Sequence, residues 1–585
     1  MFQIKNFVVA LIIILCPLML VFGQRKQMSA ADYHLKNGIA FLEKQQIDRA
    51  ILEFNAAIKL KPAFAEAHNM LGLAYARKGD AKTALESFRK ATELDSKNFK
   101  AFRNIGNALQ ELGDIDGSIE AFKQAVKLQP ADADTRLLLG LTYQRKQLVD
   151  ASISELKEAV KLNPQLIEAQ FYLGYALASK GQFDEAIIAF ERTIKLNPNF
   201  GDGFYYLGTA RLFSGNVEGA IPVLKTATKL LPNHADSHYY LAVALRKMND
   251  PQAAMNELVT AAKLAPEMIE ARQAMGQMLQ ENEDLDEAIA QYREVIKLKP
   301  DYVQAYNDLG LALVAKREPD AAIEAFTTAI KLSPNYLIAH LNLGMAYIQK
   351  SDYNAAIAQY RRLLELAPNS AEVHYNLGLA LKSKDQFDEA LIELKMAVAL
   401  QPDLQEAHYT VGVILLQQAK LDDAALAFNN AIKAKADYAE AQYALGTVYQ
   451  QQGKLDDAIA AFRLALKTAP NAPEIHNTLG TALRQKGDME AARAEFQEAA
   501  RLNKKKSDLQ ASIFALNTGI AKMKEGKTDE AMERFTEAIR LNSEDAKAHF
   551  YLAKALLAKG QREAALVEYQ KAKQLNPRIK PLEDK

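Results

Sequence analysis

The sequence has a single cysteine, no tryptophan and no net charge, and each of these features narrows the protein's class. The cysteine, Cys16, lies in an apolar leader, so the rest of the chain can form neither a disulfide bond nor a thiolate site. Lys+Arg and Asp+Glu each total 72, which leaves no basic excess to neutralise phosphates and argues against nucleic acid as a ligand. With 585 residues, 49% of them hydrophobic, the chain is globular and too long for one ordinary domain.

The N-terminal leader predicts export. Its apolar stretch, residues 7–22, is shorter than the roughly 20 residues of a spanning helix and has the length typical of a signal peptide. Val21 and Gly23 predict cleavage before Gln24, so residues 1–23 are interpreted as a signal peptide and residues 24–30 as a short linker. We therefore expect an exported protein, periplasmic or associated with the cell envelope.

The alternative is an uncleaved anchor that associates with the membrane through this N-terminal apolar segment. Lys5 before the apolar stretch and Arg25 and Lys26 after it roughly balance, so the positive-inside rule does not choose an orientation. The absence of cysteine after the leader suits an oxidising compartment under either interpretation.

A period of 34 residues runs through the rest of the sequence. We call one glycine or alanine per unit the reference position and count other positions from it. The reference residues are Gly38, Gly72, Gly106, Gly140, Gly174, Gly208, Ala242, Gly276, Gly310, Gly344, Gly378, Gly412, Gly446, Gly480, Gly519 and Ala553. Fourteen units in register occupy residues 31–506, an insertion occupies 507–511, two further units occupy 512–579, and 580–585 form a tail.

Each unit has the pattern of two closely packed helices. A small residue recurs at position +12 and an aromatic residue or leucine at position +16, as in Ala50 and Phe54. Small residues let two helices approach closely, and the larger side chain fills the space between them. Proline recurs at position +24 in twelve units, where it ends the second helix.

This pattern resembles the tetratricopeptide repeat, and the resemblance covers residues 31–579. It implies an all-α fold, an α-solenoid in which antiparallel helix pairs stack into a right-handed superhelix with a groove lined by the first helices. Family members that grip a terminal carboxylate use lysines where this chain mostly has Glu or Asp, and an asparagine that here appears only as Asn107. The resemblance therefore does not predict that kind of clamp.

Prolines and an insertion that depart from the 34-residue pattern predict where the helix geometry of the array changes. Pro251 and Pro319 fall at the start of second helices and Pro473 at the start of a first helix, where proline is tolerated. Pro222 falls inside the second helix of unit six, which predicts a kink there. The insertion at 507–511 predicts a second joint. No polar capping helix follows the last unit, so we expect a partner or another copy of the chain to cover that end.

The histidines look at first like a repeated chemical site. Eight of the nine occupy position −4, and many units carry an acidic residue two positions earlier, as in "EAHNMLGLAY" at Glu66–Tyr75. We interpret the ring as a space filler between the two helices of a unit and the acid as a favourable charge at the first helix's N-terminus. Neighbouring helix axes are about 8–10 Å apart, too far for stacked histidines to share a zinc ion, so we expect no metal site.

Positions −3 and −2 carry the strongest ligand-binding hypothesis. Stacked first helices align these positions as ladders of aromatic rings and amides, which suit an extended peptide or a sugar polymer. The alternative is that the rings pack between adjacent first helices. The candidate contacts are Phe171, Tyr205, Tyr239, Tyr375, Tyr409, Tyr443, Asn69, Asn104, Asn342 and Asn376, supplemented by Tyr172, Tyr206 and Tyr240.

No catalytic constellation, phosphate-binding loop or cofactor motif stands outside the repeat pattern, so we expect a non-enzyme with no cofactor. The first hypothesis is an exported scaffold that binds protein or peptide segments in its groove and supports assembly of a cell-envelope complex. The alternative is a module for polysaccharide secretion or glycan binding.

Overall fold

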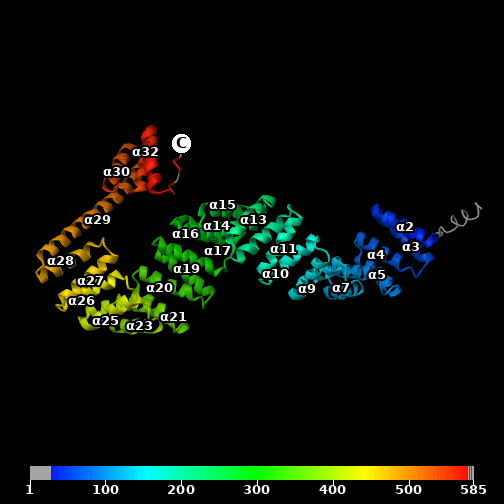
Figure 1. Cartoon of the computed structure of the whole chain (residues 1–585), viewed down its shortest axis with the longest axis horizontal. Helices are drawn as coiled ribbons and strands as arrows, with labels where there is room; N and C mark the ends of the chain where they lie inside the picture. The colour runs from blue at the N-terminus through cyan, green and yellow to red at the C-terminus, as the bar shows by residue number, and fades with distance from the viewer. Residues whose placement is uncertain (1–27, 578, 580, 583–585) are drawn as a thin grey trace, which may run out of the picture. The chain divides into compact units, whose positions relative to one another are not determined.

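The computed structural model describes residues 28–577, 579, 581 and 582, so the predicted signal peptide lies outside the described residues. The described chain is all-α and divides after Pro300 into two compact bodies, each a stack of helix pairs (Figure 1). The expected all-α solenoid is confirmed. The boundary between the bodies falls close to the end of unit eight.

In the first body the helices are α2 Ala30–Glu43, α3 Ile47–Leu60, α4 Ala65–Lys78, α5 Ala81–Leu94, α6 Phe99–Glu111, α7 Ile115–Leu128, α8 Ala133–Arg145, α9 Val149–Leu162, α10 Ile167–Ser179, α11 Phe183–Leu196, α12 Gly201–Phe213, α13 Val217–Leu230, α14 Ala235–Lys247, α15 Pro251–Leu264, α16 Ile269–Glu281 and α17 Leu285–Leu298. In the second body they are α18 Val303–Ala315, α19 Pro319–Leu332, α20 Leu337–Gln349, α21 Tyr353–Leu366, α22 Ala371–Lys382, α23 Phe387–Leu400, α24 Gln405–Gln417, α25 Leu421–Ala434, α26 Ala439–Gln451, α27 Leu455–Thr468, α28 Pro473–Lys486, α29 Met489–Lys524, α30 Thr528–Leu541, α31 Ala546–Ala558 and α32 Arg562–Leu575.

Unit two shows how the sequence builds one helix pair. Gly79 ends α4 with φ +85°, a left-handed conformation that L side chains rarely adopt, and the Asp80 side chain then caps α5 by accepting from the Thr83 amide at 3.0 Å. Glu66 lies in the first turn of α4, as predicted from the helix dipole. Tight turns of this kind keep the two helices of each pair antiparallel.

The glycine at the reference position allows the two helices of a unit to pack closely together. A Cβ atom at Gly72 would lie 2.5 Å from Cε1 of Phe88, the aromatic residue at position +16, so no larger residue fits without displacing that ring. Phe88 is buried in the core of the unit. The same contact recurs along both bodies, which confirms the predicted packing of small and aromatic positions.

Proline positions behave largely as predicted. Pro251, Pro319 and Pro473 each begin a helix, which confirms their placement at positions where no amide donor is needed. Pro222 lies within α13, and the helix runs from Val217 to Leu230 on both sides of it. The ring removes one backbone hydrogen bond without ending the helix.

The predicted joint at residues 507–511 differs from expectation. These residues lie inside α29, a continuous 36-residue helix that joins the second helix of unit fourteen to the first helix of unit fifteen (Figure 1). The usual proline at position +24 is replaced by Lys504, and residues 503–511 hold neither proline nor glycine, so nothing in the segment stops the helix. Even so, no helix among the described residues is long and apolar enough to cross a membrane.

Candidate functional site

Positions −3 and −2 meet across neighbouring units. The ring of Phe171 lies 5.5 Å from that of Tyr206, and the ring of Tyr205 lies 6.0 Å from that of Tyr240, each pair joining one first helix to the next. The structure thus brings the predicted ladders together. It also shows that much of each ring's surface is covered by the neighbouring helix, since these rings are half-buried.

The asparagines form buried rungs between first helices. Asn104 donates from Nδ2 to Oδ1 of Asn69 at 3.0 Å, and Asn342 donates to Asn307 at 2.8 Å. All four side chains are at most 9% exposed. An amide that is buried and bonded to its neighbour satisfies the fold's own polar groups, so these rungs serve helix packing. Asn376 is half-buried.

Units eleven to thirteen carry a closed version of the tyrosine ladder. The Tyr443 hydroxyl and the Thr478 hydroxyl are 3.2 Å apart, and the half-buried ring of Tyr375 packs against the hydrophobic core beneath it. Tyr409 packs its ring 5.4 Å from Tyr438. The rings of this ladder therefore find their partners within the protein.

Units five to seven instead carry an open aromatic surface. A pocket of about 340 Å³ opens between α10, α12 and α14, near the start of α11, and is mostly apolar. We call its six ring-bearing residues the aromatic surface: Tyr175, Phe183, Tyr205, Tyr206, Phe213 and Tyr240. Phe213 stacks on Phe183 with centroids 5.8 Å apart and meets the edge of Tyr240 at 5.9 Å. The pocket is thus held by ring contacts from three successive units.

Three of these residues, Tyr175, Phe183 and Phe213, were not predicted from the sequence. Phe213 is 59% exposed and Tyr175 is 39% exposed, although both are large aromatic side chains. A signal was present: position +5 is polar or alanine in every unit except at Phe213, and position +1 is aromatic only at Tyr175. Large aromatic side chains that break the repeat rule and stay exposed mark this part of the surface as a candidate contact site.

Burial leaves the inner rings of the aromatic surface uncharged. It raises the pKa values of Tyr205, Tyr206 and Tyr240 above the ordinary tyrosine value, with smaller contributions from acids such as Asp236. The phenols therefore remain neutral at physiological pH and present hydrogen-bonding hydroxyls within an apolar wall.

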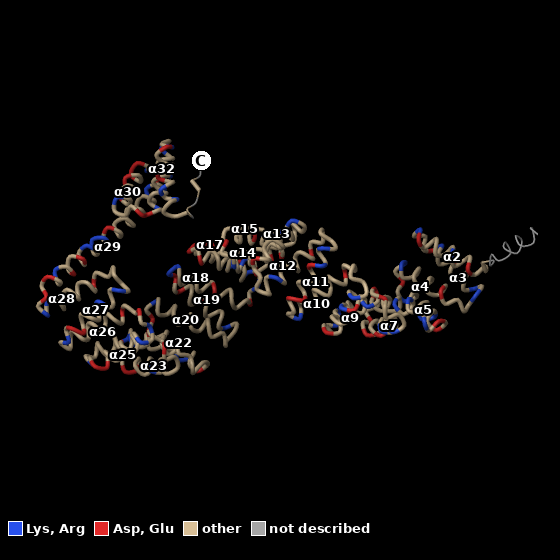
Figure 2. Tube along the Cα trace, viewed as in Figure 1, with Lys and Arg blue, Asp and Glu red and all other residues tan. Residues whose placement is uncertain are grey.

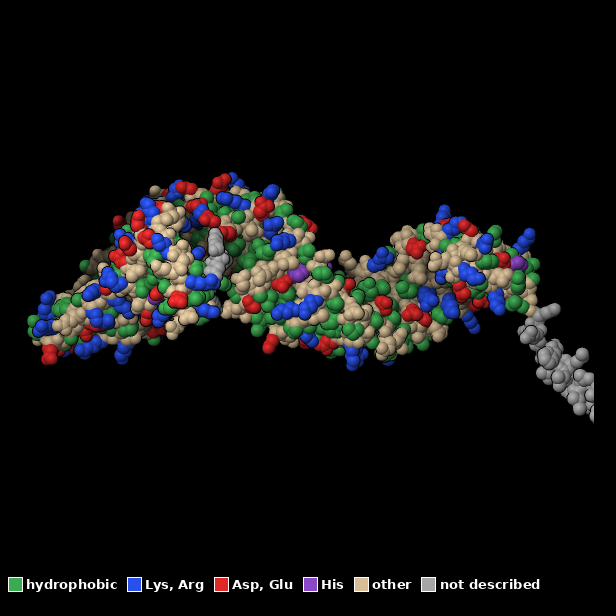
Figure 3. All heavy atoms as spheres, turned by 90° about the horizontal axis from the view of Figure 1, so that it is seen from above, with side chains coloured by type: hydrophobic (Ala, Val, Ile, Leu, Met, Phe, Trp, Pro, Cys, Tyr) green, Lys and Arg blue, Asp and Glu red, His purple; other side chains and the backbone are tan. Residues whose placement is uncertain are grey.

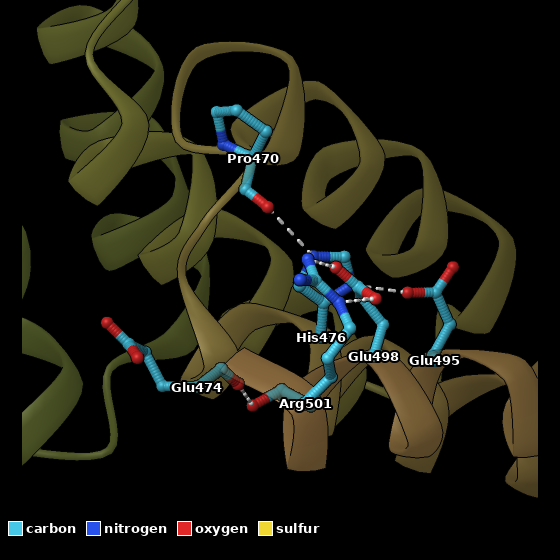
Figure 4. Close-up of polar contacts among 7 residues, drawn as sticks. Pro470, Glu474, His476, Glu495, Glu498 and Arg501 are labelled. Carbon is cyan, nitrogen blue, oxygen red and sulfur yellow. Dashed lines mark hydrogen bonds and ion pairs between the residues drawn. The ribbon is translucent and has the colours of Figure 1, made fainter. Parts of the chain in front are cut away.

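The histidine at position −4 links the first helix of its unit both to the second helix and to the preceding turn. His476 bonds through Nδ1 to Glu495 on the partner helix at 2.6 Å and donates from Nε2 to the carbonyl oxygen of Pro470 at 3.1 Å (Figure 4). The same pair of contacts occurs at His238, His374 and His549.

Other residues at position −4 make similar contacts. Arg136 donates to the Pro130 carbonyl and to Glu155, and Gln442 donates to the Ala436 carbonyl. The function of this position is thus to tie the first helix to the turn before it, whichever donor is present. No cluster of three or more metal-ligating side chains occurs in the part of the chain that the structure describes.

Charge on the surface is mixed rather than gathered. On the face shown in Figure 3, Lys and Arg side chains alternate with Asp and Glu over the helices. Many of these charges pair the end of a first helix with the start of the second helix in the unit before it, as Lys78 of α4 does with Asp48 of α3 at 2.7 Å. Such exposed pairs contribute little stability individually.

Comparison with known families matches the observed architecture. Models described as tetratricopeptide repeat or TPR repeat match residues 35–99, 106–147, 133–166, 167–200, 212–278, 274–336, 344–385, 371–404, 409–473, 443–507 and 516–578. The chain belongs to the tetratricopeptide-repeat family. Its scaffold is of the kind that supports protein–protein interaction. A comparison with curated proteins gives no significant match.

Several solved structures match this chain over part of its length. YrrB, described as a TPR protein with an unusual peptide-binding site, is 26% identical over 32% of this chain and 95% of its own, with a TM-score of 0.30. MamA is 28% identical over 29% of this chain and 92% of its own, with a TM-score of 0.28. Yeast Tom70 is 18% identical over 80% of this chain and 99% of its own, with a TM-score of 0.35.

Proposed function

We propose that this tetratricopeptide-repeat protein is a non-enzymatic, exported scaffold that binds protein segments on its aromatic surface and supports assembly of a cell-envelope complex. The observation that carries the proposal is the exposure of Phe213 and Tyr175 beside a pocket, at repeat positions where other units have smaller or more polar residues. Exposed rings at the rim of a pocket are typical of protein recognition sites.

The chemistry of the pocket favours an extended peptide with an apolar side chain. A volume of about 340 Å³ accepts one or two apolar side chains, while the hydroxyls of Tyr205 and Tyr240 offer donors to a peptide carbonyl. Because rings with two side-chain torsions lose little entropy on binding, the aromatic surface suits an interaction of useful affinity.

Export is the second part of the proposal and rests on the sequence. The apolar leader at residues 7–22 and the lack of cysteine after Cys16 both suit a protein that works outside the cytoplasm. N-terminal sequencing of the protein recovered from cells tests it. A mature chain that begins at Gln24 supports export by a cleaved signal, whereas a chain that keeps residues 1–23 supports the anchored alternative.

Peptide selection tests the binding part directly. Short random peptides displayed on phage are selected against the full chain, and the selected peptides are then measured by fluorescence anisotropy against Y175A/F213A. We expect the selected peptides to carry an aromatic or aliphatic anchor residue, and we expect Y175A/F213A not to bind them. A matched control, L52S, removes an exposed apolar residue that lies outside the pocket and leaves binding intact.

The glycan alternative is decided by the same variants. Aromatic rings also stack on sugars, so soluble polysaccharides are tested by affinity electrophoresis with the wild type and Y175A/F213A. Retardation of the wild type by a polysaccharide, lost in the double variant, together with no selected peptide, would replace the peptide proposal with the glycan one.

A further inference from the structure

The continuous helix α29 leaves two faces of the helix stack without their usual neighbours. In the regular array, the first helix of each unit packs on the second helix of the unit before it, as α28 does on α27. Here the first half of α29 packs on α28 and the second half packs on α30 and α31. Between the buried residues Leu502 and Ser512 the helix has no buried residue.

Unit fifteen carries a distinct residue at the position that normally meets the unit before it. Position −5 is alanine, glycine, serine, threonine, valine or isoleucine in fourteen units, and tyrosine or phenylalanine only at Tyr33 and Phe514. Ala67 and Ala548 at this position are fully buried, whereas Phe514 is 75% exposed and Tyr33 is 52% exposed. Unit one likewise has no helix pair before it among the described residues. The exposure of Phe514 therefore shows that the side of unit fifteen that would normally pack on the preceding unit is uncovered.

Two hollows lie beside this segment. One, of about 610 Å³, is bounded by the turn at residues 468–474 and by Leu502, Lys505, Lys506 and Leu509 of α29. The other, of about 280 Å³, is bounded by residues 501–509 of α29 and by the end of α30. Leu509, which is 45% exposed, borders both, and Ile513 continues the apolar line towards Phe514 with 48% exposure.

The charge of the segment is positive. Lys504, Lys505 and Lys506 are consecutive and exposed, and none of the three has an ion pair within the described chain. Figure 2 shows Lys and Arg in blue along α29. Arg501 is held by Glu498 through two contacts, and Asp508 and Glu474 are the acids that border the hollows. Three lysines without partners leave the basic charge uncompensated.

We propose that residues 501–514 of α29 dock an acidic amphipathic helix of a partner protein. The missing neighbour in the stack is a helix, so the uncovered faces and hollows suit the apolar side of one, and the lysines suit acidic residues along its edge. A second copy of this chain that docked through the same segment would bring two lysine runs together, and such like charges repel. This docking site is separate from the aromatic surface and does not depend on it.

A pair of helical peptides tests the proposal. Each is labelled with fluorescein and is about 20 residues long, enough for a stable helix, with leucine on one face and either glutamate or lysine on the other. Anisotropy is measured with the full chain and with K504E/K505E/K506E. We expect the acidic peptide to bind the wild type about tenfold more tightly than the variant, and the basic peptide to show the reverse preference.

Matched variants separate docking from general charge. K97E/K100E/K127E makes the same charge change at three exposed lysines elsewhere and should leave the affinity for the acidic peptide unchanged. F514S removes the exposed ring and should weaken binding while retaining the wild-type circular dichroism spectrum. Equal binding of the acidic peptide to wild type and K504E/K505E/K506E overturns the proposal.

Two further results also overturn it. Sedimentation of the wild type as a dimer that K504E/K505E/K506E does not change, together with failure of the acidic peptide to bind, would assign the faces to a second copy. Stronger association with vesicles of anionic phosphatidylserine than with the acidic peptide, lost in K504E/K505E/K506E, would assign the segment to a membrane surface.

Discussion

The two tyrosine ladders occupy the same repeat positions, but the rings of one are covered by the protein itself and the rings of the other border an open pocket. In units eleven to thirteen, Tyr443 bonds to the Thr478 hydroxyl of the next unit, Tyr375 packs against the core and Tyr409 packs against Tyr438. In units five to seven, Tyr205 and Tyr206 border an open pocket whose rim is formed by Tyr175 and Phe213. Aromatic residues at positions −3 and −2 are therefore compatible with pure packing. The residues that open the surface lie at positions +1 and +5.

This difference separates packing from recognition in a repeat protein. A residue that follows the repeat pattern is explained by contacts with its own and neighbouring units, as the buried pair of Asn69 and Asn104 shows. A residue that departs from the pattern and remains exposed, such as Phe213, costs solubility without adding to the core. The departures are accordingly where we place the ligand contacts.

The largest expected effect is on the closed ladder. Each ring removed in Y375A/Y409A/Y443A should cost about 2 kcal/mol, less than a fully buried ring, because the rings are half-buried. Urea unfolding followed by circular dichroism measures the loss, and peptide affinity at the aromatic surface should not change while the protein is folded. A triple variant of unaltered stability that no longer binds peptide would make the closed ladder the binding site.

The next effect is on the open surface. Y175A/F213A should lower peptide affinity by about 2 kcal/mol, or about 30-fold, because exposed aromatic anchors dominate such interfaces. Its urea midpoint should stay close to that of the wild type, since neither residue is buried. Isothermal titration with a selected peptide gives the affinity. A large loss of stability with unchanged affinity would reverse the roles assigned to the two ladders.

A smaller effect is expected at the amide rungs. N104A leaves the buried Asn69 without its donor and should destabilise the protein by about 1–3 kcal/mol. N376A removes the same residue type from the position in unit eleven, where it is half-buried, and should cost less. Urea midpoints compare the two. Equal costs would show that the rung hydrogen bond contributes nothing beyond side-chain packing.

The smallest effect is alkaline destabilisation of the closed ladder. Burial, with help from Glu440, raises the pKa of Tyr438 to about 12, so the folded state keeps the neutral phenol where an unfolded tyrosine ionises near 10. Stability from this group is present below pH about 10 and is lost as the pH rises towards about 12. Y438F should lose less stability over this range in urea titrations. Identical losses would contradict the burial of this phenol.

Much of the fold follows from local rules that a sequence displays. Glycine at the reference position and an aromatic residue at +16 predict a close helix pair because one side chain must fill the space above the other backbone. Prolines such as Pro251 and Pro319 mark helix starts because an N-terminal residue needs no amide donor. These rules act within one unit or between neighbours, so spacing alone reveals them.

Three features were not predicted from the sequence, because they depend on contacts between distant side chains or on the absence of a helix-stopping residue. The run of α29 through residues 507–511 follows from the lack of a stop residue, which is easily overlooked beside an insertion that looks like a joint. The double contact of His476 requires knowing that the carbonyl at Pro470 and the carboxylate at Glu495 converge on one ring. The openness of the aromatic surface depends on side-chain arrangement across three units.

Site-specific photo-crosslinking tests the central assignment most directly. The full chain is expressed in its own cells with p-benzoylphenylalanine at position 213, in place of Phe213, and separately in place of Leu426, which is 62% exposed on α25. The account predicts that the probe at position 213 captures a protein through one defined peptide, identified by mass spectrometry, and that the probe at 426 does not. Equal capture at both positions, or capture at 426 alone, would contradict the aromatic surface as the binding site.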